Sequence, residues 1–219
     1  MSNTHWWLYE VWGDDFSNDM RNSKYNVVRD AYYDLPTSKY YGKSIIAPET
    51  KSKLLEEQSW RWYPWPTKIT TPGEHPEALY ADPALKTLKS TAGATYLDQY
   101  MLRLAETYLL RAEAFLMKGD KEKAANDINE VRNRAHTSEV VASEVTIDYI
   151  LDERARELVY EEFRRITLGR LGKYVERVRK YNTLNGPRVE DYHELFPIPY
   201  SAIEANKDAV LEQNPGYKN

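Results

Sequence analysis

The chain contains no cysteine and only four phenylalanines among its 219 residues. The absence of cysteine excludes disulfides, thiolate metal sites and a cysteine nucleophile. No stretch approaches the roughly 18 apolar residues of a membrane-spanning helix, and no charged start followed by an apolar run marks a secretory signal. The net charge of −4 leaves no basic excess, so we expect no nucleic-acid partner.

Tyrosine and tryptophan are abundant, with 18 and 6 copies. These side chains join an apolar ring to a polar tip, which suits wet binding surfaces and half-buried loops alike. All six tryptophans lie within residues 1–97, where repeated X-Pro steps predict loops and short strands. We therefore expect two parts, an irregular, aromatic-rich ligand-binding segment over residues 1–97 and a helical part over residues 98–219.

The helical part begins with apolar residues spaced as in an amphipathic helix, from Met101 to Phe115. Gly119 and Asp120 predict its end, and residues 124–131 predict a second helix. Small residues at Ala112 and Ala124 let two antiparallel helices pack closely, in the pattern of a tetratricopeptide repeat. Because about three such repeats are needed for a continuous core, we expect partner repeats to be missing from this chain and flanking apolar faces to be uncovered. The residues assigned to those faces are Ala105, Leu109, Ala112 and Leu116.

Two further helices are predicted downstream. Thr146 is placed to cap a third helix, whose apolar side runs to Phe163, and a fourth should cover Ile166–Lys180. The third carries many acidic and basic residues in the stretch Ile150–Leu158 and just beyond it. Because compensating cations surround its carboxylates, we interpret them as parts of ion pairs rather than as catalytic acids and bases.

No pattern for catalysis or for a bound cofactor is present. The four histidines, His5, His75, His136 and His193, are scattered without metal-ligand spacing, and nucleotide-binding glycine motifs are absent. We therefore expect no enzyme activity, no cofactor and no metal.

A cluster of rings and polar groups near the start is the candidate binding site. Its members are Trp6, Trp7, Trp12, Asp14, Asp15 and Asn18. Aromatic faces can stack on sugar rings while carboxylates and amides bind hydroxyls. The alternative is that these rings fix an irregular segment to the helical scaffold. For a second ring group, Trp60, Trp62, Tyr63 and Trp65, we favour packing of an extended segment with one face buried.

Several segments together resemble the SusD/RagB family of cell-surface nutrient-binding lipoproteins. They are Asn26–Tyr33, Lys39–Gly42, Tyr63–Lys68, Leu104–Ala114, Gly119–Ala125, Ile128–Arg132, Asp152–Leu158, Leu195–Pro199 and Gln213–Tyr217. The resemblance implies a mainly α fold, a SusD-like α-solenoid of tetratricopeptide-like helical pairs with a loop-rich extension. It also implies an earlier N-terminal portion, carrying a lipid anchor, that has no counterpart in these residues.

The function implied by this resemblance is non-catalytic capture of an oligosaccharide or polysaccharide. The partners would be the glycan and a SusC-like TonB-dependent transporter at the outer membrane, with the membrane reached only through a lipid anchor absent from this chain. Two alternatives stay open. One is capture of peptides, as in RagB-like members, and the other is a helical scaffold that binds only a partner protein.

Overall fold

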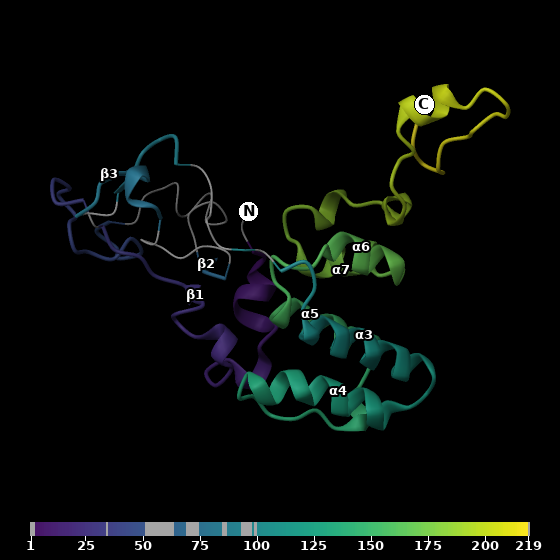
Figure 1. Ribbon diagram of the computed structural model, residues 1–219, viewed down its shortest axis with the longest axis horizontal. Coiled ribbons are helices and arrows are strands. Elements are labelled where there is room, and N and C mark those ends of the chain that lie inside the picture. Colours follow the sequence, from purple (N-terminus) through teal and green to yellow (C-terminus); the bar gives the residue numbers. More distant parts are fainter. Residues whose placement is uncertain are drawn as a thin grey trace. The chain divides into compact units, whose positions relative to one another are not determined.

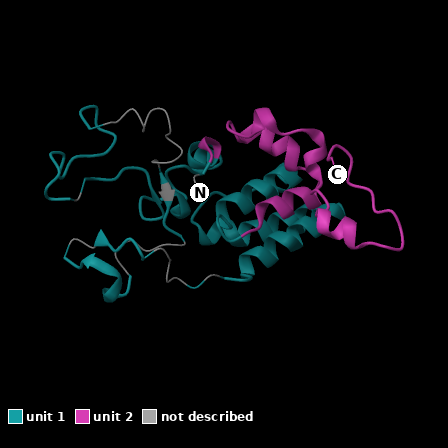
Figure 2. Ribbon diagram, turned by 90° about the horizontal axis from the view of Figure 1, so that it is seen from above, with its two compact units in different colours: residues 1–3, 7–161 teal, residues 4–6, 162–219 magenta. Residues whose placement is uncertain are grey.

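The computed structural model describes residues 3–33, 35–50, 64–68, 75–84, 87–92, 98 and 100–218. They form two compact units, coloured separately in Figure 2. The first unit contains Met1–Asn3 and Trp7–Glu161, and the second contains Thr4–Trp6 and Glu162–Asn219. Most of the regular structure is helical, as the sequence predicts, with only short strands beside it.

The first unit is built on an antiparallel helical pair, α3 (Leu104–Met117) and α4 (Lys121–Arg134), which lie side by side in Figure 1. Gly119 takes a φ of +81° in the turn between them, a conformation that glycine adopts without strain. The Asp120 carboxylate then accepts a hydrogen bond from the Lys123 amide at 3.1 Å and caps α4. The predicted tetratricopeptide-like pair is therefore confirmed.

The core between these helices consists of small and branched side chains without exposed surface, among them Leu109, Ala112, Ala124 and Ile128. The prediction that Leu109 and Ala112 lie on an uncovered face is therefore wrong, because α4 and its neighbours cover them. The large apolar side chains that α3 does expose are Leu104, Leu110 and Met117. The helix also begins three residues later than predicted, since Met101 precedes it and is 96% exposed.

The third helix, α5 (Ile147–Glu157), packs against the pair. The Thr146 hydroxyl accepts a hydrogen bond from the Tyr149 amide at 3.1 Å, so the predicted cap is confirmed. The helix ends at Glu157, and Tyr160 then takes a positive φ of 63°. Phe163 is 80% exposed, which corrects the prediction that it continues the apolar side of this helix.

The irregular part of the first unit holds two small antiparallel sheets. Strand β1 (Val27–Val28) pairs with β2 (Trp65–Pro66), and β3 (Tyr80–Asp82) pairs with β4 (Thr87–Leu88). Loops and short strands are thus what the described residues show, as predicted. The prediction for Trp60, Trp62 and Tyr63 lies outside the described residues.

The second unit contains α6 (Arg164–Arg170), α7 (Tyr174–Tyr181) and α8 (Tyr200–Ala205). The single helix predicted over Ile166–Lys180 is wrong, because Gly172, with a φ of +62°, ends α6 and separates it from α7. Within the part of the chain that the structure describes, no helix combines the length and the apolar character needed to cross a bilayer.

Candidate functional site

The predicted ligand-binding residues lie in a series of short turns at the start of the chain. A π-helical turn covers Trp6–Glu10, and 3-10 turns follow at Gly13–Asp15 and Met20–Asn22. Gly13, the first residue of the second turn, has a φ of +55°, a conformation that glycine adopts without strain. The rings and carboxylates thus lie on successive turns, but they are unequally exposed.

Trp7 and Trp12 are buried, with 6% and 3% of their surfaces exposed. The Trp7 indole N–H donates to the Ala155 carbonyl of α5 at 2.7 Å, and the Trp12 indole N–H donates to the Trp7 carbonyl at 2.8 Å. The two rings meet edge to face, with centroids 5.3 Å apart. In this conformation the two rings therefore pack the loop onto the helical scaffold, as the alternative interpretation has it.

Trp6 belongs to the second unit, where its ring is half-buried. It stacks on Tyr181 of α7 with centroids 4.2 Å apart, and the Arg177 guanidinium lies 5.4 Å from the ring centre. These contacts occupy much of the ring surface that stacking on a sugar would need.

The three polar members of the predicted site, Asp14, Asp15 and Asn18, also differ in their exposure to solvent. Asp15 is tied to the scaffold, because its carboxylate accepts from Arg132 at 2.7 Å and from the Ser138 hydroxyl at 2.9 Å. Burial raises the pKa of Asp15, but the hydrogen bonds from Ser138 and the charge of Arg132 outweigh it and lower the pKa. Asp14 and Asn18 are exposed, so these two are the members of the predicted site that face solvent.

Among the residues described within 1–97, the most accessible tryptophan, tyrosine and phenylalanine rings are tyrosines that were not among the predicted site residues. Tyr25, Tyr32 and Tyr41, called here the exposed tyrosines, show 76%, 63% and 58% of their surfaces. The sequence does carry a signal for Tyr32 and Tyr41, because tyrosine doublets stand at residues 32–33 and 40–41. Doublets at the two arms of a loop place one ring of each pair outward.

A short hairpin displays two of these tyrosines. The Tyr33 amide donates to the Lys43 carbonyl at 3.0 Å, and the Ile45 amide donates to the Ala31 carbonyl at 2.8 Å. Tyr33 and Tyr40 meet within the hairpin, with ring centroids 5.4 Å apart. An exposed phenol ring provides an apolar face for stacking and a hydroxyl that both donates and accepts hydrogen bonds.

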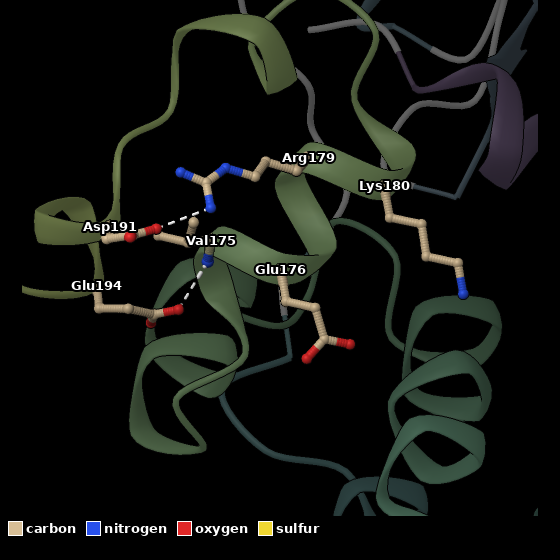
Figure 3. A pocket seen from close by; sticks show the side chains of 6 residues that line it. All are labelled: Val175, Glu176, Arg179, Lys180, Asp191 and Glu194. Atoms are coloured by element: carbon tan, nitrogen blue, oxygen red, sulfur yellow. Dashed lines mark hydrogen bonds and ion pairs between the residues drawn. The ribbon is translucent and has the colours of Figure 1, made fainter.

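The second unit contains an open pocket of about 640 Å³. Figure 3 shows the side chains that line it, which are Val175, Glu176, Arg179, Lys180, Asp191 and Glu194. Arg179 pairs with Asp191 at 2.7 Å, and Glu194 accepts the Val175 amide at 2.8 Å. The lining supplies charged hydrogen-bonding groups but no aromatic face, so it lacks the ring that stacking on a sugar requires.

No group of three or more histidine, cysteine or acidic side chains lies close enough to hold a metal ion, within the residues that the structure describes. Glu153 and Glu157 of α5 are engaged in ion pairs, as the sequence analysis predicts. Glu153 alone contacts Arg21, Arg132 and Arg156, at 2.7, 3.0 and 2.8 Å. What the described geometry offers for function is a set of exposed rings and polar groups on the loops.

Comparison with known proteins gives a family and one curated relative. The starch-binding protein SusD of Bacteroides thetaiotaomicron is 40% identical over 138 residues, which are 59% of this chain and 24% of that protein. A solved structure titled BT4246 aligns with a TM-score of 0.46 and 25% identity, over 60% of this chain and 26% of the other. This chain thus spans about a quarter of the length of each. The profile of the SusD family matches residues 9–217, and the chain belongs to that family.

Proposed function

We propose that this protein captures a glycan at the cell surface for uptake and carries out no chemistry on it. The observation that carries the proposal is the 40% identity to a starch-binding protein, which covers more than half of this chain. The described geometry agrees with a binding role, because Glu153 and Glu157 of α5 form ion pairs and solvent-facing rings and hydroxyls lie on the loops.

The resemblance to the family further supports a location and a partner. A SusD-like protein would sit on the outer membrane through a lipid anchor and would pass its ligand to a SusC-like TonB-dependent transporter. Both the location and the partner are proposed from the family as a whole. The part of this chain that matches the curated relative corresponds to 24% of that protein's length.

The proposed contact surface combines the predicted site with the exposed tyrosines. Asp14 and Asn18 face solvent and can bind hydroxyls, while Tyr25, Tyr32 and Tyr41 offer ring faces. Ligand binding by Trp6, Trp7, Trp12 and Asp15 stays a prediction. In this conformation their contacts suit them to supporting the surface, since stacking on a ligand would require the rings to leave their present partners.

Tyrosine substitutions test the proposal. Alanine at Tyr32 and Tyr41 removes two exposed rings, each of which is expected to contribute on the order of 1 kcal/mol to stacking. The double variant should therefore bind the preferred polysaccharide roughly thirtyfold more weakly, as measured by affinity electrophoresis. Tyr200→Ala is the matched control, because Tyr200 is 60% exposed but lies in the second unit.

Unfolding should separate a binding effect from a folding effect. Because both substituted rings are largely exposed, the midpoint of urea unfolding should stay close to that of the unmodified protein. Unchanged affinity in the double variant would refute the role of these rings. Retention of a peptide mixture with no retention of any polysaccharide would favour the peptide-binding alternative instead.

A further inference from the structure

Two buried carboxylates stand one helical turn apart at the end of α5. Glu153 has no exposed surface, and Glu157 is 1% exposed. A buried carboxylate is strongly unfavourable unless cations and hydrogen bonds compensate it. These two residues, called here the acidic anchor, therefore depend on the groups that reach them from other segments.

The first of these groups comes from the loops that precede the tyrosines. The Arg21 guanidinium lies 2.7 Å from a Glu153 oxygen and 3.1 Å from a Glu157 oxygen, so one side chain bridges both carboxylates. Asp19 holds Arg21 in place, accepting from its Nε at 2.9 Å and from its Nη2 at 2.7 Å. A planar guanidinium bound on both sides fixes the orientation of the loop as well as its distance from α5.

A second group comes from the segment after β2. Lys68 donates to the Glu157 carbonyl and lies 3.0 Å from the Glu161 carboxylate. Arg103 joins the same place, 2.9 Å from Glu157 and 2.6 Å from Glu161. The residues on both sides of the small β1–β2 sheet are thus tied to one end of α5.

Hydrogen bonds connect the residues that bind the end of α5 to the segment that contains Tyr25. Thr67, next to Lys68, donates its amide to the Asn26 carbonyl at 3.0 Å and its hydroxyl to the Tyr25 carbonyl at 2.7 Å. On the other side, the Asn26 amide group donates to the Met20 carbonyl at 2.6 Å, one residue before Arg21. Tyr25 and β1 are therefore held from two directions, and the hairpin that displays Tyr32 and Tyr41 continues from β1.

We propose that Glu153 and Glu157 are positioning residues, which hold the tyrosine-bearing segment (residues 25–33 and 35–45) in the geometry that binds ligand. The affinity part of this proposal rests on the proposed glycan-binding function. The attachment itself does not, because it can be measured without any ligand.

The charges around Glu153 indicate that its ion pair with Arg21 is permanent and does not titrate near neutral pH. Burial raises the pKa of Glu153, but Arg156, Arg21 and Arg132 outweigh burial and hold the pKa at about 2. Burial lowers the pKa of Arg21, yet Glu153 and Asp19 raise it above its ordinary value. Both partners stay charged through neutral and mildly acidic conditions.

Amide hydrogen exchange on the full chain tests the attachment. In Glu153→Gln one buried charge is lost while the shape of the side chain is kept, so the amides of Tyr33 and Ile45 should lose on the order of a hundredfold in protection. The amides of α3 and α4 should lose less protection than the amides of Tyr33 and Ile45. Glu130→Gln is the matched control, because Glu130 is exposed on α4.

A second pair of variants tests the proposal even if Glu153→Gln does not fold. Arg21→Gln removes the bridge from the loop side and leaves Glu153 with Arg132 and Arg156 in the helical core. Arg21→Lys keeps the charge without the forked geometry and should restore part of the protection that Arg21→Gln loses. Unchanged exchange of the segment in both Glu153→Gln and Arg21→Gln would overturn the proposal.

Binding of starch to the same variants completes the test. We expect the dissociation constant to rise by roughly tenfold or more when the segment is released, in parallel with the loss of protection. Faster exchange with unchanged affinity would overturn the positioning role, since the ligand would then bind elsewhere. If the unmodified protein binds no polysaccharide, the proposed function fails, and the exchange data still decide whether the anchor holds the segment.

Discussion

Acid should weaken the first unit through Glu153, and the size of the effect follows from the surroundings of this carboxylate. Its pKa of about 2 in the folded chain lies below the ordinary value of 4.5. A carboxyl with a lowered pKa stabilises the fold above the unfolded-state value and loses that contribution as the pH falls toward the folded-state value. The depression corresponds to roughly 3 kcal/mol at neutral pH, of which about 2 kcal/mol should be gone by about pH 3.

Comparison of the unmodified protein with Glu153→Gln measures this contribution, because carboxylates that share no arginine with Glu153 titrate alike in both. Urea unfolding followed by far-ultraviolet circular dichroism gives the free energy of unfolding of each at neutral pH, about pH 5 and about pH 3. The difference between the two proteins should shrink by about 2 kcal/mol across this range. A constant difference would show that Glu153 has an ordinary pKa in the fold and would refute the argument from its three arginines.

Four other substitutions have expected outcomes that urea unfolding can check. Gly216→Ala should destabilise the second unit by about 2 kcal/mol or more, because a side chain at its φ of +89° is strained and would overlap the Tyr192 ring. Gly172→Ala, with open space around it, should show only the smaller conformational effect. Leu109→Ala should cost about 3 kcal/mol through the cavity it leaves in the core of the helical pair. Trp7→Phe should cost on the order of 1–3 kcal/mol, because it leaves the buried Ala155 carbonyl without this donor. In each case a change below about 0.5 kcal/mol, the size expected of a neutral surface substitution, would contradict the stated cause.

The parts of the fold that the sequence predicts are those with local causes. The pair α3–α4 follows from helical spacing and from Gly119, and the start of α5 follows from Thr146 as its cap. The break between α6 and α7 is missed because apolar spacing continues across Gly172, whose positive φ leaves no mark on that spacing.

The candidate site depends on contacts between distant parts of the chain, which spacing cannot reveal. Trp7 is buried because its indole binds a carbonyl 148 residues away, and Arg21 finds its carboxylate 132 residues away. A cluster of tryptophans in sequence is therefore compatible with packing onto the scaffold as well as with ligand binding. Tyr32 and Tyr41 are accessible because a hairpin holds them outward, and only the doublets at residues 32–33 and 40–41 indicate this beforehand.

The most direct test of the account is affinity electrophoresis of the 219-residue chain in gels cast with a panel of polysaccharides, starch among them. Glycan capture predicts that migration slows with increasing concentration of at least one polysaccharide, and that the polysaccharide gains no new reducing ends. Migration that no polysaccharide changes would contradict glycan capture by this chain, and the release of reducing ends would contradict a role without catalysis.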